Sequence, residues 1–536
     1  MIKHVLEMPV YREVDVAVVG GGPGGVAAAL AAAKNGAKTL LVERYYALGG
    51  NMSLGLVHSL HGYRSDSNYS SKKHPTSDWD NPLVAKTPIT MGIYNRIYEE
   101  NGTGFRGHYG DPSLRENVDE EVVIYALDQM MKEAGVEVLF NTTAFDVIKE
   151  GDAVTGIVIA NKSGPQVIKA KVVIDCSADA DIATRAGVDF TYGDDTGRAH
   201  GISLQMQIGG IDVERFLEYL KNRPEPTPEE KEAILHDKYM LTNGGSKSPD
   251  ARFSLQKGDT GEHHMEGKRL SWDEQYEAMK NGEFLVLKDC VEAEWFQYLK
   301  DHPYPETPYM PNTTTPLPIY PKSPSFNWFG IVRDGRVRFD QAMSGVHECL
   351  VDSTNEEAIS HALVLCRRIN WIYMKFFRER IPGFENAYII KNATYSGRDS
   401  RQIVGEYCVT LEDIGSGRQF EDAIANVWRA NNLHLINGQY GFRMWFETKK
   451  PFTVPYRSLV PKTVDNLLVG GRSISKHYLV RISSMVPCMQ YGEAAGVAAA
   501  LAVREHIRPR DVDIRELQET LGFTYEFKDY VAGESF

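Results

Sequence analysis

The sequence predicts an α/β fold, with a parallel sheet and a β-meander that carry a large inserted α+β unit. Three observations predict it. Near the N-terminus, an apolar run leads through a glycine-rich turn into an alanine-rich stretch, which is the pattern of strand, turn and helix. A similar apolar run, glycine pair and alanine-rich stretch recur near the C-terminus. Residues 191–440 lie between these regions and lack that pattern, so we expect them to form the inserted unit.

Composition and charge exclude several classes of protein. The chain has 536 residues, of which 42% are hydrophobic and 24% charged, as is typical of a folded globular protein. Its formal net charge of −13 argues against general binding to phosphate backbones, so we expect no nucleic-acid partner. We also expect no membrane span and a cytoplasmic location, because the chain has no apolar run of about 18 residues and no secretory leader pattern.

Cysteine and histidine spacing argues against metal and dithiol chemistry. The six cysteines are scattered and form no Cys-x-x-Cys pair: Cys176, Cys290, Cys349, Cys366, Cys408 and Cys488. We expect them to be reduced structural thiols. His263 and His264 are adjacent, but no carboxylate accompanies them at metal-ligand spacing, so no metal site is predicted.

The first glycine-rich turn predicts a dinucleotide-binding site. Residues 14–19 predict a strand and residues 26–34 a helix, and between them Gly20, Gly22 and Gly25 match G-x-G-x-x-G. The first glycine permits the turn, the second lets a pyrophosphate approach the backbone, and the third lets helix and strand pack closely. Pro23 and Gly24 complete the turn, and the helix N-terminus would face the phosphates.

An acidic residue completes this unit. Residues 38–42 predict a second strand that ends in Glu43, at the spacing from the glycines at which a carboxylate accepts from a ribose hydroxyl. A tight turn without a ligand is the alternative. Because strand, helix, second strand and carboxylate all occur at the required offsets, the sequence predicts a Rossmann-like dinucleotide-binding domain.

The residues after Glu43 carry a resemblance to a known family. Arg44 follows directly, and Gly49, Gly50 and Asn51 come several residues later. In this region the chain resembles the FAD-dependent oxidoreductases of glutathione-reductase-like fold, where an acidic residue, an arginine and a Gly-Gly pair surround the adenosine ribose and pyrophosphate. Two glycines would also let backbone amides close on phosphate or ribityl oxygens. The resemblance implies FAD as the cofactor.

The next region predicts a helix at 120–134 and then several strands. The expected strands cover residues 136–140, 144–148, 154–160, 166–171 and 172–175. The middle three resemble the β-meander of flavin domains, in which the backbone at Ala144 would meet the adenine ring. The segment 176–181 resembles the family's Asp-Ala-Thr-Gly segment, with Ala178 in place of the glycine.

The C-terminal region resembles the family's second FAD segment. Residues 464–469 predict a strand that leads into Gly471 and Arg472. The alanine-rich stretch 489–500 predicts a helix whose N-terminus can offer amides to the flavin and stabilise negative charge on the reduced ring. A buried alanine helix without a ligand is the alternative. The predicted cofactor-binding residues are Gly20, Gly22, Pro23, Gly24, Gly25, Glu43, Arg44, Gly49, Gly50, Asn51, Ala144, Gly471, Arg472, Gly492, Ala495 and Gly496.

Four residues are candidates for the reaction centre. His477 and Arg481 resemble the His and Arg, four residues apart, that bind a substrate carboxylate in fumarate-reductase-type flavoproteins. The alternative is that Arg481 contacts FAD or an interface carboxylate and that His477 lies on the surface. His58 and His61 follow the Gly-Gly pair, and the chain could bring them near the isoalloxazine ring as a base or a covalent link. They could equally be structural histidines.

The predicted organisation has four parts: residues 1–190 and 441–510 form the FAD-binding domain, 191–440 an inserted substrate or cap domain, and 511–536 a tail. Residues 301–324 are rich in proline and predict an ordered connector, and the polar residues 62–81 suit a lid, a subunit contact or a solvated loop. Arg398 and Arg401 either position substrate or flavin or form an inter-domain salt bridge. The sequence leaves a homo-oligomer open.

The resemblance implies an FAD-dependent oxidoreductase that transfers a hydride between a carbon of a small polar or carboxylate-bearing substrate and flavin N5. Oxidation of a CH–OH or CH–NH group and reduction or desaturation of a C=C bond are both open, and His477 with Arg481 favours the second. No second G-x-G-x-x-G follows a strand, so the electron acceptor or donor is not identified. The alternatives are an electron-relay subunit of a larger complex and a tRNA-modifying flavoprotein.

Overall fold

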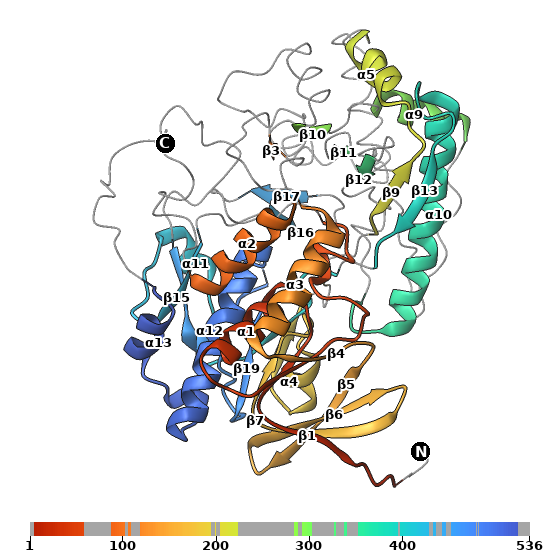
Figure 1. Ribbon diagram of the computed structural model, residues 1–536. Helices are drawn as coiled ribbons and strands as arrows, with labels where there is room; N and C mark the ends of the chain where they lie inside the picture. Colours follow the sequence, from red (N-terminus) through yellow and green to blue (C-terminus); the bar gives the residue numbers. More distant parts are fainter. Residues whose placement is uncertain are drawn as a thin grey trace.

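The computed structural model describes most of the two terminal regions and parts of the middle. The described residues are 5–57, 87–101, 106–108, 118–193, 199, 204–222, 283–287, 292–302, 326–328, 337–339, 352–394, 397–427, 432–435, 442–445, 452–478, 480 and 482–523. They form a seven-stranded sheet with packed helices and a second, six-stranded sheet (Figure 1). The predicted α/β fold with an additional domain is confirmed, while the predicted domain boundaries remain predictions.

The seven-stranded sheet combines strands from both ends of the chain. Its strands in spatial order are β4 (Glu137–Leu139), β2 (Thr39–Val42), β1 (Val10–Val19), β7 (Gly164–Asp175), β6 (Ala153–Asn161) and β5 (Thr143–Glu150). The C-terminal strand β19 (Leu467–Val469) also pairs with β7, in parallel, with Leu467 opposite Val173. Strands β4, β2, β1, β7 and β19 are parallel, and β5, β6 and the first part of β7 form the antiparallel meander.

Strand β7 belongs to both parts of this sheet. Residues 164–169 pair antiparallel with β6, whereas residues 173–175 pair parallel with β19. The prediction of two separate strands, 166–171 and 172–175, was therefore wrong. No glycine or proline interrupts residues 166–175, so nothing in this stretch favours a turn.

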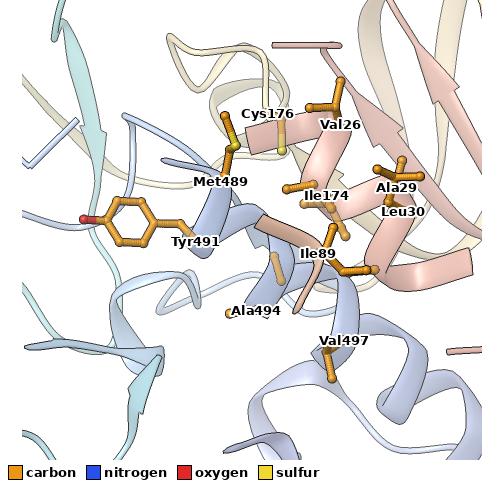
Figure 2. Packing of buried hydrophobic residues seen from close by; sticks show 14 of the residues in the cluster. Val26, Ala29, Leu30, Ile89, Ile174, Cys176, Met489, Tyr491, Ala494 and Val497 are labelled. Atoms are coloured by element: carbon orange, nitrogen blue, oxygen red, sulfur yellow. The ribbon is translucent and has the colours of Figure 1, made fainter. Parts of the chain in front are cut away.

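Two helices cross at the centre of the molecule. They are α1 (Pro23–Lys34), which follows the glycine-rich turn, and α12 (Met485–Glu505), which follows β19 (Figure 1). In Figure 2, Val26 and Leu30 of α1 lie on one side of α12, and Tyr491 points to the other side. The Tyr491 hydroxyl donates to the carbonyl of Ile482 at 3.0 Å.

Glycines let the two helix backbones touch. A Cβ on Gly492 would lie 1.9 Å from the carbonyl oxygen of Gly24, and a Cβ on Gly496 would lie 2.2 Å from that of Ala28. Real Cβ atoms do not approach so closely, so any side chain at Gly492 or Gly496 would force the helices apart. The small residues predicted for this helix are therefore required by packing.

Two further helices form where the sequence patterns predict them. Helix α3 (Glu120–Ala134) matches the predicted range, with the Asp119 carboxylate accepting from the Glu121 amide at 2.9 Å as its N-cap. A helix was expected in the region that forms α10 (Glu356–Arg380), because four apolar residues share one face over 355–371. The structure continues this helix to Arg380, since Tyr373, Phe376 and Phe377 extend the buried face.

The second sheet lies beside α10. Its strands in spatial order are β13 (Tyr388–Asn392), β9 (Met206–Gly209), β12 (Val337–Phe339), β11 (Phe326–Trp328), β10 (Glu283–Leu287) and β3 (Arg106–His108). Figure 1 shows α10 along the outer edge of the molecule, next to β13. The amide of Thr394, just after β13, donates to the carbonyl of Leu54 at 2.9 Å, which joins this region to the segment after the Gly-Gly pair.

Smaller elements complete the described part of the chain. The helices are α2 (Pro88–Asn101), α4 (Asp181–Arg185), α5 (Val213–Asn222), α9 (Glu292–Asp301), α11 (Leu411–Ser416) and α13 (Ile514–Thr520). Three two-stranded sheets pair β8 (Phe190–Tyr192) with β14 (Arg401–Ile403), β15 (Ala423–Val427) with β18 (Phe452–Pro455), and β16 (Asn432–Leu435) with β17 (Phe442–Trp445).

Of the helices in the described ranges, none has the length and apolar character needed to span a bilayer. Residues 62–81 and 303–324 lie outside the described residues.

We expect Gly496→Ala to lower the free energy of unfolding by about 1–3 kcal/mol, because the new methyl would overlap the Ala28 carbonyl. Gly92→Ala is the matched control: Gly92 is also a helix-interior glycine, but a Cβ there would meet nothing within 4 Å. It should raise the free energy of unfolding by about 0.5–1 kcal/mol. Urea unfolding measures both, and equal effects in the two variants would contradict the packing argument.

Candidate functional site

The loop between β1 and α1 contains glycines in two different environments. Gly20 has φ +98°, and a Cβ there would lie 2.4 Å from the Cys176 carbonyl oxygen, while a Cβ on Gly25 would lie 1.7 Å from the Gly20 carbonyl oxygen. At these two positions the protein's own backbone leaves no room for a side chain, with or without a ligand. A Cβ on Gly22 would meet no protein atom within 4 Å, and φ is −72° at this residue. Gly22 therefore leaves space beside the N-terminus of α1, as the second glycine of the motif should.

Glu43 connects this loop to β2. Its side-chain oxygens accept from the amide of Gly21 at 2.5 Å and from the amide of Tyr45 at 2.8 Å. Burial raises the pKa of the Glu43 carboxyl, although these hydrogen bonds oppose the shift. Each carboxylate oxygen has a second lone pair, so Glu43 can still accept from a ribose hydroxyl. Arg44 is exposed and lies over the ring of Tyr45, 5.0 Å from its centroid.

The Gly-Gly segment crosses the glycine-rich loop. The Gly49 amide donates to the carbonyl of Gly21 at 2.8 Å, and a Cβ on Gly50 would lie 3.0 Å from the Cα of Gly22. The Asn51 carbonyl then accepts from the amide of Val57 at 2.9 Å, so the chain turns back on itself. Segments separated by more than twenty residues thus form one surface beside Gly22.

The segment after β19 lies against the same surface. The Gly470 amide donates to the Asp175 carbonyl at 3.0 Å, and a Cβ on Gly24 would lie 2.6 Å from the Gly470 carbonyl oxygen. Gly471 has φ +142° and open space where a Cβ would be. The structure therefore brings together both predicted glycine-rich segments.

The remaining predicted cofactor residues have other positions. Gly492 and Gly496 face the backbone of α1, and Ala495 is fully buried in α12. Ala144 is half-buried on β5, where it pairs with Ile159. Pro23 is the first residue of α1. Contact of these residues with the cofactor remains a prediction.

The turn after β7 is held by a buried carboxylate. Asp175 accepts from the backbone amides of Ser177, Ile182 and Ala183 at 2.9, 3.0 and 2.8 Å. Burial raises the pKa of the Asp175 carboxyl, and the amide hydrogen bonds oppose this. Within this turn Ala178 has φ +80°, a region that favours glycine. Ala178 therefore holds a backbone conformation that is strained for a residue with a Cβ.

Charged side chains gather beside this turn. The pKa of Asp181 is raised to about 6, chiefly by burial and by the neighbouring carboxylates of Asp179 and Asp175. The positive charges of Arg44 and Arg401 oppose the shift. Arg401 donates to Asp181 at 3.2 Å, so this arginine forms an ion pair with the segment after β7.

The structure places one of the four candidate catalytic residues. The His477 side chain is exposed, its ring lies 4.8 Å from that of Tyr478, and its amide donates to the carbonyl of Val409 at 2.9 Å. His58, His61 and Arg481 lie outside the described residues. Their roles, like that of His477, remain predictions.

A buried ion pair lies next to His477 and was not predicted from the sequence. The ammonium of Lys476 lies 3.5 Å from the Asp399 carboxylate, with side chains 0% and 3% exposed. Asp399 also accepts from the Ser483 hydroxyl at 2.6 Å, one residue before the N-cap of α12. In the part of the chain that the structure describes, no group of three or more His, Cys, Asp or Glu could hold a metal ion.

The buried residue Glu493 has a structural role that the sequence did not predict. Its buried carboxylate accepts from the amides of Ile89 and Thr90, both at 2.8 Å, and from the Thr90 hydroxyl at 2.7 Å. It therefore caps α2 from a helix about 400 residues away in sequence. Burial raises the pKa of this carboxyl, against the effect of the hydrogen bonds.

Comparison with known proteins identifies the family. The family described as FAD dependent oxidoreductase matches residues 15–521. The chain belongs to this family. It is therefore an FAD-dependent oxidoreductase, and FAD is its cofactor, as the glycine-rich segments predict. This family match does not distinguish glutathione-reductase-like members from others.

Two curated relatives match the chain over a limited part. Digeranylgeranylglycerophospholipid reductase 3 of Methanosphaera stadtmanae is 29% identical over 171 residues, which cover 29% of this chain and 40% of that protein. Thiamine thiazole synthase of Methanococcus vannielii is 28% identical over 171 residues, 30% of this chain and 55% of the relative. The chain therefore matches about half or less of either relative. A crystal structure of a geranylgeranyl bacteriochlorophyll reductase-like protein from Thermoplasma acidophilum aligns with a TM-score of 0.39 and 15% identity, over 95% of this chain and 82% of that chain.

We expect Ala178→Gly to raise the free energy of unfolding by about 0.5–1 kcal/mol. Relief of the positive φ contributes about 1–2 kcal/mol, and the greater freedom of glycine in the unfolded chain offsets about 0.5–1 kcal/mol of it. Ala186→Gly is the control, because Ala186 is buried with an ordinary φ of −71° and should lose stability. Urea unfolding compares them, and a loss of stability in both variants would refute strain at Ala178.

Proposed function

We propose that the chain transfers a hydride between a carbon of a small polar or carboxylate-bearing substrate and N5 of FAD. The observation that carries this proposal is the start of α12, which follows the loop with His477. The N-cap residue Ser484 makes no side-chain cap, and the first turn of α12 contains no acidic residue. These helix amides can stabilise negative charge on a reduced flavin, which is the electrostatic requirement of hydride transfer.

The described residues fit FAD in the orientation that the motif implies. The space beside Gly22 and the N-terminus of α1 suit the pyrophosphate, and Glu43 suits the adenosine ribose. The Gly49-Gly50 segment, which crosses the loop, would cover the cofactor from the other side. Bound FAD supplies the two-electron chemistry, and the protein supplies binding, orientation and charge.

The substrate side rests on His477 and Arg481. A guanidinium can bind a carboxylate through two parallel hydrogen bonds, and an imidazole can donate to the substrate or relay a proton. The name of the Methanosphaera relative describes a reductase, which favours reduction over oxidation here. An electron-relay subunit and a tRNA-modifying flavoprotein are the competing functions, and both predict that small metabolites leave the flavin unchanged.

Gly22→Ala tests the cofactor site separately from the fold. A Cβ at Gly22 meets no protein atom within 4 Å, so the unfolding free energy of the FAD-free protein should stay within about 0.5 kcal/mol of wild type. The same methyl group would enter the space proposed for the pyrophosphate. We expect the dissociation constant for FAD, measured by fluorescence titration, to rise at least about tenfold.

FAD affinity that is unchanged in Gly22→Ala would refute the proposed position of the pyrophosphate. The FAD family assignment would still hold in that case.

Anaerobic mixing with a library of small carboxylates and hydroxylated metabolites tests the reaction itself. We expect at least one compound to bleach the oxidised flavin or to reoxidise the reduced flavin. Arg481→Ala should slow this step about 10–100-fold at unchanged FAD content, because a charge-assisted hydrogen bond to the substrate is lost. Arg515→Ala, an exposed arginine on α13, is the control and should react like wild type.

If no compound changes the flavin spectrum at full FAD occupancy, the hydride-transfer proposal fails, and the electron-relay and tRNA-modifying functions remain. If bleaching occurs and Arg481→Ala reacts at the wild-type rate, Arg481 does not bind the substrate.

A further inference from the structure

A two-stranded ribbon joins the chain segments that enter and leave most of the inserted region. Strands β8 and β14 pair antiparallel, with Tyr192 opposite Arg401. In the chain, α10 and all strands of the second sheet except β3 lie between β8 and β14. We call β8 together with residues 397–403 the stem. The stem is therefore one of the connections that position this region relative to the flavin segments, beside the hydrogen bond from Thr394 to Leu54 and the ion pair of Lys391 with Glu120.

Arg472 lies at the base of the stem and binds three protein acceptors. Its Nε donates to the Ala178 carbonyl at 2.8 Å, its Nη1 to the Gly397 carbonyl at 2.7 Å, and its Nη2 to the Asp179 carboxylate at 2.8 Å. The side chains of Arg472 and Asp179 are 13% and 4% exposed, so this ion pair is largely shielded from water. Two of the three acceptors belong to the strained turn after β7, and the third belongs to the stem.

Asp179 extends these contacts to the inserted region. Its carboxylate accepts from the hydroxyl of Ser400 in the stem and, at 3.5 Å, from that of Ser353, which precedes α10. Its backbone carbonyl accepts from Arg401 at 3.3 Å. The guanidinium of Arg401 also lies over the ring of Phe190 on β8, 5.3 Å from the centroid. One ion pair therefore connects four segments: the turn, the loop after β19, the stem and the start of α10.

This arrangement does not suit a phosphate ligand. An arginine that binds the pyrophosphate must direct its donors at the cofactor, whereas Arg472 directs donors on both arms of its fork at carbonyls and a carboxylate. The negative charge of Asp179 beside it would also repel a phosphate. The position of Arg472 after the Gly470-Gly471 pair predicts a cofactor contact, whereas its hydrogen bonds indicate a contact within the protein.

We propose that Arg472 is a positioning residue: with Asp179 it locks the stem to the turn after β7 and to the loop before α12, and it does not bind the cofactor phosphates. The lock holds the inserted region over the FAD site in a fixed orientation. This role concerns FAD binding and orientation only, so it stands or fails independently of the proposed substrate.

The test compares Arg472→Met, Arg472→Lys, Asp179→Asn and the double variant Arg472→Met/Asp179→Asn. FAD is titrated into each FAD-free protein, and the visible circular dichroism of the bound flavin reports its orientation. We expect Arg472→Met and Asp179→Asn to raise the FAD dissociation constant by similar factors, about fivefold to tenfold, and to change the flavin spectrum alike. The FAD dissociation constant of the double variant should not exceed that of the single variant that binds FAD less tightly, because each single substitution already removes the shared interaction.

Arg472→Lys further distinguishes a positioning role of Arg472 from binding of the cofactor phosphates. A lysine keeps the charge, and a phosphate site would retain most of its affinity. A single ammonium cannot replace a planar fork that reaches three acceptors in different directions, so we expect Arg472→Lys to behave like Arg472→Met. Wild-type affinity in Arg472→Lys, or weak binding in Arg472→Met with normal or tighter binding in Asp179→Asn, would overturn the proposal.

Hydrogen exchange provides a readout that does not depend on FAD. The amides of Ile403 and Val404, bonded to Ser473 and Asp189, should exchange at least about tenfold faster in both single variants. The amide of Gly20, bonded to Val42 in the central sheet, should not change. Uniformly faster exchange across the protein would show general destabilisation and overturn the stem-specific role.

Two further variants keep the test informative if the ion-pair variants fold poorly. Ser400→Ala removes one contact to Asp179 without changing a charge, and it should give the same pattern at smaller amplitude. Arg457→Met breaks another arginine–aspartate pair, with Asp422 at 2.9 Å, which lies away from the stem and is more exposed. It should leave FAD affinity, the flavin spectrum and stem exchange at wild-type values. An Arg457→Met variant that matches Arg472→Met would overturn the proposal.

Discussion

The direct backbone contact between α1 and α12 is the constraint on which the FAD site depends. Gly24 lies between the carbonyl of Gly470 and the backbone of Gly492, and no side chain fits at either helix position. This contact brings the loop after β19 against the turn after β1, although these segments lie at opposite ends of the chain. The parallel pairing of β19 with β7 fixes the same arrangement from the side of the sheet. The two glycine-rich segments can form one site only because both conditions hold.

Glycines in this site serve two purposes that the sequence motif does not separate. Gly20, Gly25 and Gly492 allow close approach within the protein, whereas Gly22 leaves space that no protein atom fills. The difference is physical, since packing glycines stabilise the protein without a ligand and a spacing glycine matters only when the cofactor is bound. Ala178 shows the opposite case, in which the positive φ is kept although glycine is absent.

Sequence patterns predicted the parts of this structure that depend on local chemistry. The turn after β1, the capped helix α3 and the small-residue helix all follow from glycine spacing, capping residues and apolar periodicity, and the resemblance to flavin domains implied the meander. The break expected between residues 171 and 172 was wrong because alternation alone does not show where a strand changes partner. The acceptors of Arg472 could not be predicted, since Asp179 lies 293 residues away and the contact depends on how two loops meet. The capping of α2 by Glu493 was missed for the same reason.

Three buried carboxylates show how an acidic chain can build a site for an anionic cofactor. Glu43, Asp175 and Glu493 each accept from backbone amides at the start of a segment, and burial raises the pKa of all three. Because amides rather than arginines satisfy these charges, the carboxylates fix loops and helix ends without using cationic side chains. Arg472 and Arg401 remain for the ion pairs that connect the stem to the flavin segments. The phosphates can then be bound by the N-terminus of α1 and the loop amides, so a net charge of −13 is compatible with binding FAD.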